Sequence, residues 1–200
     1  MNSLYEYELN LNQEGYTLIA GCDEAGRGPM AGPLVASAVI LPKGLQVDLL
    51  NDSKKVSKKN REILFDLITD KALSYSIVFI DVEEVDLLNV YKASKKAMVE
   101  AINNLKIKPE IILSDAMPLD IETKYVSIIH GDSLSSNIAA ASILAKVSRD
   151  RYMEKMALIY PEYGFEKHKG YVTKLHLEKL QKFGPCEIHR KSFAPVKKYL

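Results

Sequence analysis

The sequence has 200 residues, of which 47% are hydrophobic and 26% charged. This composition is typical of one globular domain with its own core, and it excludes an intrinsically disordered chain. With 27 Lys and Arg against 26 Asp and Glu, the net charge of +1 excludes a polycation that binds nucleic acid through bulk charge alone.

The small net charge hides an uneven distribution along the chain. Residues 145–200 carry 13 Lys and Arg and 6 Asp and Glu, whereas the residues before them carry 14 and 20. A basic C-terminal quarter therefore follows an acidic body. Chance unevenness over solvated surfaces explains the same numbers, so the charge pattern alone does not predict a partner.

The N-terminus and the cysteine content bear on location. Cys22 and Cys186 are too few for a disulfide framework and suit a reducing cytosol. The first residues lack the basic and apolar regions of a signal peptide, and the longest apolar run, 34–41, is far too short to span a bilayer. We therefore expect a soluble, cytoplasmic protein with no membrane partner.

Hydrophobic patterning and turn residues predict alternating strands and helices. In chain order we predict strands at 16–22 and 34–41, a helix at 58–73, a strand at 75–80, a long helix at 83–105, strands at 110–113 and 124–129, and helices at 133–158 and 174–182. Ser57 is the expected N-cap of the first helix, and Pro109 ends the long one. A Gly- and Pro-rich turn at 26–33 joins the first two strands.

This order predicts an α/β fold, a five-stranded mixed sheet flanked by helices with a small C-terminal helical extension. We assign residues 1–200 to one domain, with a core over about 16–158. The extension, about 160–200, is the expected substrate-binding part.

Acidic side chains follow three of the predicted strands. Asp23 and Glu24 end the first strand, Asp115 follows 110–113, and Asp132 follows 124–129. Because carboxyl ends of parallel strands line the ligand crevice of open α/β sheets, the four acids are expected to form one cluster. Taken singly, Asp132 also suits a helix N-cap and Asp115 a turn cap.

A cluster of four carboxylates repels itself unless a cation neutralises it. Oxygen ligands without Cys or His indicate a hard ion, Mg²⁺ or Mn²⁺. Two such ions can hold the attacking water and the leaving oxygen in phosphodiester cleavage. The sequence therefore predicts a two-metal phosphodiesterase site.

The turn after the first strand resembles a phosphate-binding loop only in part. Gly21 and Gly26 have the spacing of such a loop, but Arg27 and Gly28 replace its lysine and hydroxyl residue. A nucleotide-binding loop is thus not expected. Glycines on both sides of Arg27 still let backbone N–H groups approach a ligand closely.

Several segments together resemble a known family. They are GCDEAGRGPMAGP at 21–33, NDSKKVS at 51–57, GD at 131–132 with IAAASILAKVSRD at 138–150, HKGY at 168–171, and the C-terminal GPC, HR and FAP blocks between 184 and 195. In order and spacing they are similar to the motifs of bacterial ribonuclease HII, the type 2 ribonuclease H family, over residues 19–196.

The resemblance implies a ribonuclease H-like fold and an endoribonuclease. Its substrates would be the RNA strand of RNA/DNA hybrids and ribonucleotides embedded in duplex DNA, and its products would carry 5′-phosphate and 3′-hydroxyl ends. The family's catalytic and metal-binding acids map onto Asp23, Glu24, Asp115 and Asp132, with Mg²⁺ or Mn²⁺ as cofactor.

The resemblance also implies residues that recognise the substrate. The family's loop that reads the 2′-hydroxyl maps onto Gly26, Arg27 and Gly28, and its sugar-packing tyrosine maps onto Tyr171. Only the 2′-hydroxyl distinguishes RNA from DNA at a single nucleotide. The sequence departs from the family at Val172, where a glycine is usual.

Further contacts to nucleic acid are expected around residues 53–61. Ser53, Lys54 and Lys55 belong to the family-like segment, and five positive charges fall between Lys54 and Arg61. A solvated helix start explains each single lysine equally well. Cys186 and His189 alone are too few ligands for zinc.

Two alternatives stand beside this interpretation. A ribonuclease HIII-like enzyme would carry an extra N-terminal domain and a different loop from Gly26-Arg27-Gly28-Pro29. A catalytically silent nucleic-acid-binding module has no need for four acids, which weaken phosphate binding. We expect an enzyme that acts on nucleic acid as a monomer.

Overall fold

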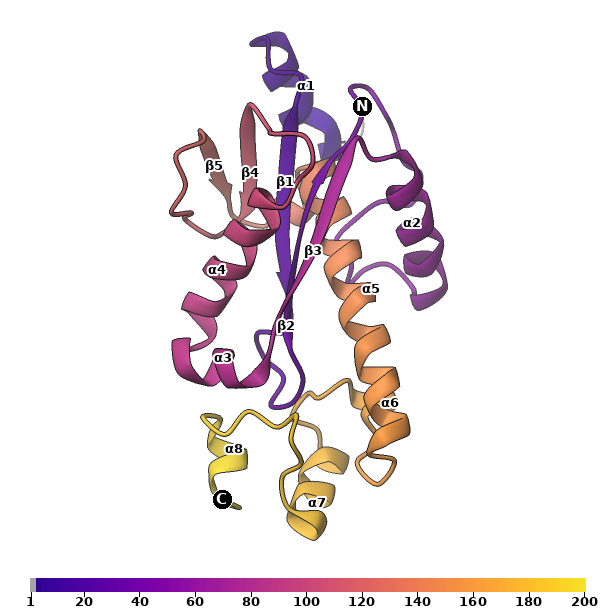
Figure 1. The fold of residues 1–200 in the computed structure, drawn as a ribbon. Helices are drawn as coiled ribbons and strands as arrows, with labels where there is room; N and C mark the ends of the chain where they lie inside the picture. The colour runs from indigo at the N-terminus through magenta and orange to yellow at the C-terminus, as the bar shows by residue number, and fades with distance from the viewer. Residues whose placement is uncertain (1–2) are drawn as a thin grey trace.

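The computed structural model describes residues 3–200, which form a mixed sheet covered by helices (Figure 1). The strands are β1 (Ile19–Ala25), β2 (Leu34–Ile40), β3 (Ser74–Ile80), β4 (Ile111–Asp115) and β5 (Tyr125–Ile128). The α-helices are α1 (Glu6–Gln13), α2 (Lys58–Lys71), α3 (Val82–Leu88), α4 (Val90–Asn103), α5 (Ser136–Ile159), α6 (Phe165–His168), α7 (Lys174–Phe183) and α8 (Ala194–Lys197). Short 3₁₀ turns, η1 (Ser3–Tyr5) and η2 (Gly131–Ser133), precede α1 and α5. Across the described residues, no helix has the length and apolar content to cross a membrane.

The sheet confirms the predicted fold class. Its strand order is β3-β2-β1-β4-β5, with β1 antiparallel to β2 and parallel to β4, and β4 parallel to β5. The carboxyl ends of β1, β4 and β5 therefore lie at the same edge of the sheet. Because β1 is central, acidic residues near its end are surrounded by neighbouring elements.

Two helical layers enclose the sheet (Figure 1). Cys22 and Ala36 on one face pack with Met98 of α4, whereas Val39 on the other face belongs to the core of α2 and α5. In α5, residues Ile138–Ala145 are all buried, as their apolar and small side chains predict. Gly21 of β1 lies directly against the backbone of α5, which fixes this helix over the central strand.

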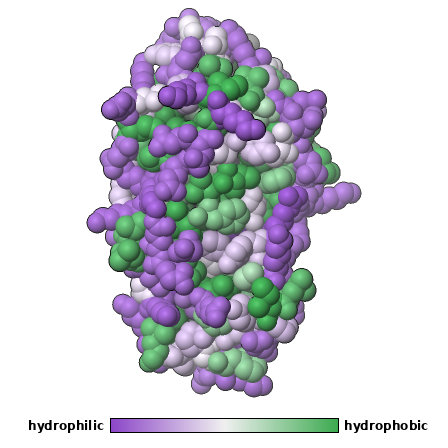
Figure 2. Space-filling model, in the orientation of Figure 1, coloured by the Kyte–Doolittle hydropathy of each residue, from purple (hydrophilic) through white to green (hydrophobic). Residues whose placement is uncertain are grey.

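The edge strand β3 shows a partly apolar surface. Phe79 and Tyr75 are about half exposed, and the Phe79 ring lies 6.2 Å from that of Tyr152 on α5. Figure 2 shows apolar residues gathered at the centre of this face, between hydrophilic flanks. The lower part of α5 therefore partly covers the exposed edge of the sheet.

Several predicted boundaries were wrong. The single helix expected at 83–105 is two helices, because Asn89 has a φ of 68° and its side chain caps α4 by accepting from Lys92 N. Leu87 and Tyr91, which a single helix with one apolar face would bury, are exposed as a result. Strand β1 continues through Ala25, so Asp23 lies within the strand and not after it.

The expected start of the helix at 133 was also wrong, and some helices were missed. Helix α5 begins at Ser136 with Ser135 as its N-cap, so Asp132 does not cap it. The sequence interpretation missed α1, α6 and α8, two of which are only four residues long. Ser57, by contrast, is confirmed as the N-cap of α2, since its side chain accepts from Asn60 N.

The C-terminal extension is held to the sheet by two buried arginines. Arg149 of α5 donates to the carbonyl oxygens of Ala31, Pro33 and Lys169, and Arg190 donates to those of Gly26, Arg27 and Gly32. Both guanidinium groups are almost completely buried. Two of the thirteen basic residues in the C-terminal quarter thus bind backbone and are not available to nucleic acid.

Glu8 joins the N-terminal helix to the start of α5, and its replacement tests that joint. One carboxylate oxygen accepts from Ser135 Oγ at 2.6 Å, Asn137 N at 3.0 Å and Asn137 Nδ2 at 3.2 Å. Since a buried carboxylate at a helix N-terminus combines charged hydrogen bonds with the helix dipole, we expect Glu8→Ala to lower the free energy of unfolding by about 2–3 kcal/mol. Chemical denaturation measures this change. Glu6→Ala, at an exposed position of the same helix, is the matched control, and equal losses for both variants would contradict the prediction.

Candidate metal centre

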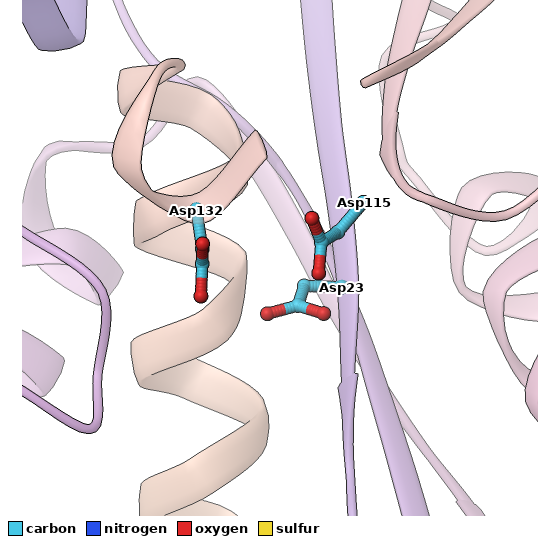
Figure 3. A group of neighbouring side chains, drawn as sticks. All are labelled: Asp23, Asp115 and Asp132. Atoms are coloured by element: carbon cyan, nitrogen blue, oxygen red, sulfur yellow. The ribbon is translucent and has the colours of Figure 1, made fainter. Parts of the chain in front are cut away.

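Three aspartates meet at the carboxyl edge of the sheet (Figure 3). Asp23, Asp115 and Asp132 each offer an oxygen, and the three oxygens lie within 4.8 Å of one another. Asp23 and Asp132 are buried, and Asp115 is partly exposed. The structure thus brings three of the four predicted acids into one group from three separate elements.

The local fold explains how each aspartate reaches this point. Asp23 comes from the central strand β1, and Asp115 is the last residue of β4. Asp115 Oδ1 accepts from Gly131 N at 2.8 Å, which ties the end of β4 to the 3₁₀ turn that carries Asp132. His130 enters this turn with a φ of 57°, so the chain reverses sharply after β5.

Glu24 is close to the aspartates but does not join their group. Successive side chains of a strand leave it on opposite sides, but the Glu24 side chain still lines the same pocket as Asp23 and Asp115. Its Oε1 pairs with Arg27 Nη1 at 3.3 Å, while its Oε2 is buried without a hydrogen-bond partner among residues 3–200. The expectation of one cluster of four carboxylates therefore holds for three, with Glu24 beside them.

Burial and mutual repulsion raise the pKa values of these acids. Burial, followed by the charges of Glu24 and Asp115, raises the pKa of Asp23 well above its usual range. Burial also raises the pKa of Glu24 against the opposing effect of Arg27, and burial with Asp52 and Asp115 raises that of Asp132. Burial and repulsion make the charged form of these carboxylates unfavourable, and a bound cation would offset both effects.

The donor set fits a hard divalent ion. All ligand atoms in the group are carboxylate oxygens, and the unpartnered Glu24 Oε2 adds another nearby acceptor. Mg²⁺ and Mn²⁺ prefer such ligands and complete their coordination with water and substrate phosphate. The aspartate group is therefore a possible site for a divalent metal ion.

The raised pKa values predict a pH-dependent response to metal. Because metal ligands must be deprotonated, added Mn²⁺ is expected to raise the unfolding temperature strongly at pH 8 and much less at pH 5. Differential scanning calorimetry at both pH values, with and without Mn²⁺, measures the difference. Asp70→Asn, which alters an exposed acid of α2, should respond as wild type, and Asp115→Asn should lose most of the response. A pH-independent shift would count against this site.

Next to the aspartates lies a pocket of about 300 Å³. Its lining includes Asp23, Glu24, Ala25, Gly26, Arg27, Gly28, Ser53, Lys54, Asp115, Ser142, Lys146 and Tyr171. Most side chains that the sequence singled out for substrate thus share one pocket with the acids. Gly26 has a φ of 102°, and an added Cβ there would overlap the Arg149 side chain, so only glycine fits this turn.

The two lysines of the family-like segment differ in their positions. Lys54 Nζ lies 3.8 Å from Asp132 Oδ2, and its side chain is 81% exposed. Lys55 lies outside the pocket that contains Tyr171 and lines an adjoining hollow with Asp132. Its Nζ lies 4.0 Å from Asp52 Oδ2. Both lysines are exposed enough to contact a phosphate backbone.

Sequence reasoning missed two residues of this pocket. Ser142 and Lys146 lie four residues apart on one face of α5. Ser142 Oγ hydrogen-bonds Ser53 Oγ at 2.9 Å and also bonds the Asp23 carboxylate, while Lys146 Nζ lies 5.9 Å from the Tyr171 ring centre. Polar residues at this spacing within an otherwise apolar helix were the available signal.

Comparisons with known proteins agree on one family. The model of the family described as Ribonuclease HII matches residues 20–196. Ribonuclease HII of Bacillus licheniformis is 51% identical over 98% of this chain and 76% of its own length. Ribonuclease HII of Acholeplasma laidlawii is 52% identical over 97% of this chain and 96% of its own length.

Solved structures agree with the observed fold. The crystal structure of ribonuclease H2 from Pyrococcus horikoshii superposes with a TM-score of 0.77 and 28% sequence identity, over 90% of this chain and 96% of that one. A match of this extent covers both the mixed sheet and the C-terminal extension. The ribonuclease H-like fold implied by the sequence motifs is therefore confirmed.

Proposed function

Because the chain belongs to the ribonuclease HII family and is a metal-dependent endoribonuclease, we propose that it hydrolyses the RNA strand of RNA/DNA hybrids and incises at single ribonucleotides in duplex DNA. One observation carries the proposal. Asp23 and Asp115 of the aspartate group line the same pocket as the Gly26–Gly28 loop and Tyr171, and Asp132 lines an adjoining hollow. A phosphodiester next to a 2′-hydroxyl can therefore meet the acids while its sugar meets the loop.

The acids have distinct roles in this proposal. Asp23 and Asp115 would hold or share two divalent ions, Mg²⁺ or Mn²⁺, and Asp132 and Glu24 would complete the outer positions. When bound, such ions activate water for in-line attack on phosphorus and stabilise the 3′-oxygen that leaves. Cleavage on that side of the phosphate gives 5′-phosphate and 3′-hydroxyl ends. Arg27 keeps Glu24 oriented through their 3.3 Å contact.

Recognition of the ribose rests on the loop and on Tyr171. The Gly26 and Arg27 carbonyl oxygens accept from Arg190, so backbone N–H groups of the loop are the expected donors to a 2′-hydroxyl, and the glycines on both sides of Arg27 allow the close approach. Tyr171, whose residue surface is 44% exposed, offers the apolar face of its ring to the adjacent sugar. Val172 is half exposed and lies outside the residues that line the pocket, so its side chain leaves the ring accessible.

Polar and basic side chains near the acids hold the phosphate backbone in this proposal. Lys54 and Lys55 are exposed beside the aspartates, Ser53 is buried next to them, and the partly buried Lys146 pairs with Asp150 and lies over Tyr171. Contacts to phosphate position a duplex without reading its sequence. Cleavage is therefore expected to depend on the ribose and not on the base, and to weaken as salt rises.

Cleavage-site mapping tests the proposed function. The substrates are a DNA duplex with one ribonucleotide, the same duplex entirely of DNA, and a long RNA/DNA hybrid, each with Mg²⁺ or Mn²⁺. We expect metal-dependent nicks 5′ to the ribonucleotide with a 3′-hydroxyl end, cleavage of the hybrid, and no cleavage of the all-DNA duplex. Nicking of the all-DNA duplex at a comparable rate, or no cleavage of either ribose-containing substrate, would refute the proposal.

A further inference from the structure

Beneath Tyr171 lies a buried cluster of polar side chains to which the proposed chemistry assigns no role. His176 and His189 are almost completely buried, and Cys186 and His168 lie beside them. The rings of Phe165 and other aromatic residues pack against the histidines. Buried polar groups cost free energy unless they are hydrogen-bonded, so these side chains are expected to pair with one another or with the backbone.

The cluster forms a directed chain of hydrogen bonds. His176 Nδ1 lies 3.0 Å from the Tyr171 carbonyl oxygen, which only accepts, so Nδ1 carries the proton and Nε2 is an acceptor. His189 Nε2, 3.0 Å from His176 Nε2, must then donate. The remaining His189 Nδ1 is an acceptor and receives Cys186 N at 3.0 Å. Every ring nitrogen thus has a partner that fits one tautomer.

Both histidines are held in the neutral form. Burial lowers the pKa of His176 to about 3 and that of His189 to about 4. Burial also raises the pKa of Cys186 to about 11, so its thiol keeps its proton and can donate to His189 Nδ1 at 3.1 Å. The order of donors and acceptors is therefore the same throughout the neutral pH range.

The two ends of this hydrogen-bond chain reach two different substrate-binding elements, Tyr171 and the Gly26–Gly28 loop. At one end, His176 holds the main chain of Tyr171, whose amide also donates to His168 O at 2.9 Å. At the other end, His189 pairs with Ala31 in an antiparallel bridge, and the next residue, Arg190, binds the carbonyl oxygens of Gly26 and Arg27. The His176–His189 hydrogen bond therefore connects the residue that holds Tyr171 with the segment that holds the Gly26–Gly28 loop.

The Gly26–Gly28 loop and the Tyr171 ring lie so close together that a small change in their separation matters. A Cβ added at Gly28 would lie 3.7 Å from Tyr171 Cε1, so loop and ring are nearly in contact. A shift of about 1 Å between catalytic or binding groups is enough to reduce a rate about a hundredfold. A bond that fixes their separation thus has a direct effect on how a ribose is placed.

We propose that His176 and His189 are positioning residues that hold Tyr171 in register with the Gly26–Gly28 loop, and that their hydrogen bond sets the selectivity for a single ribonucleotide in DNA. This inference rests on the proposed function. A long hybrid offers many ribonucleotides, so when one ribose is slightly misplaced in the site, another along the strand can bind instead. In a duplex with one ribonucleotide, a single phosphodiester qualifies, and misplacement is not compensated.

Two amide substitutions at one position test the proposal. His189→Gln places an amide near the Nε2 position and keeps the donor to His176, whereas His189→Asn reaches only the Nδ1 position and removes it. We expect His189→Asn to lower kcat/KM at least tenfold on the single-ribonucleotide duplex and less than threefold on the hybrid. His189→Gln should stay within threefold of wild type on both substrates.

Further measurements separate positioning from folding. His176→Asn keeps the donor to Tyr171 O and breaks the same bond from the other side, so it should repeat the selective loss, and the double Asn variant should lose no more than either single one. The Mn²⁺-induced rise in unfolding temperature should be unchanged in all of them. Failure of either Asn variant to fold, equal losses on both substrates, or an unchanged substrate ratio would overturn the inference. If wild type itself fails to nick the single-ribonucleotide duplex, the proposed function has failed instead.

Discussion

Replacing Asp23 by asparagine is expected to lower the rate of hybrid cleavage at least about a thousandfold, which corresponds to about 4 kcal/mol of transition-state stabilisation. Asp23 is the acid that β1 places at the centre of the group, and the neutral amide removes a charge that a divalent ion requires. Binding of the hybrid should remain near wild type, because the phosphate contacts come from other residues. Single-turnover cleavage and a binding titration with the same hybrid measure the two effects.

Stability provides an internal control for the Asp23→Asn variant. A carboxyl group with a raised folded-state pKa contributes stability that is present below the unfolded pKa and lost as pH rises through the folded pKa. Without metal at pH 8, the asparagine variant should therefore unfold at a higher temperature than wild type. Cleavage that persists in this variant, or inactivation accompanied by a lower unfolding temperature, would contradict the role assigned to Asp23. Asp70→Asn should match wild type in both measurements.

Gly21→Ala is expected to cost at least about 3 kcal/mol in the free energy of unfolding. A Cβ at Gly21 would overlap the backbone of Asn137 and Ile138, and backbone atoms of a buried helix cannot move aside as a side-chain end does. Helix α5 would have to separate from β1. Since Gly21 and Asp23 lie on the same face of β1, the displacement also opens the space between Asp23 and Ser142.

Thermal and denaturant unfolding measure this loss, which should lower the unfolding temperature by about 2–4 °C for each kcal/mol. Gly28→Ala is the matched control for stability, because its added Cβ would meet only Tyr171 Cε1 at 3.7 Å and its φ is not positive. A Gly21→Ala variant as stable as wild type would show that α5 is not fixed against β1 in the way the backbone contact indicates.

The sequence predicted the fold class and most elements because local patterns dominate them. Alternating strands and helices, the Ser57 cap and the apolar centre of α5 were all visible. The break at Asn89 was not, because a helical apolar spacing continues across it while the backbone reverses at one residue with positive φ. Helix α1 was missed since its stability comes from the buried Glu8 contact with α5 and not from its own pattern.

In the candidate site, too, some features followed from local sequence and others only from tertiary contacts. Acidic residues near strand ends, together with the parallel order of β1, β4 and β5, led to Asp23, Asp115 and Asp132 as neighbours. Glu24 was expected in the same cluster; it lines the same pocket as Asp23 and Asp115 and pairs with Arg27. The sequence showed a basic C-terminal quarter but not which of its cations are exposed, and Arg149 and Arg190 are buried on carbonyl oxygens.

The sequence by itself determined the family, the α/β fold, the acids and the glycine-flanked loop at Gly26–Gly28, because each is encoded in short segments whose residue types have few other uses. Tertiary structure alone decided which side of β1 each acid occupies, which cations face solvent, and how Tyr171 is held. These depend on contacts between segments far apart in the chain: Arg190 reaches Gly26, Ser142 reaches Ser53, and His189 completes the chain of hydrogen bonds to Tyr171. Local sequence patterns carry no information on such pairs, since burial and hydrogen-bond satisfaction are properties of the packed molecule.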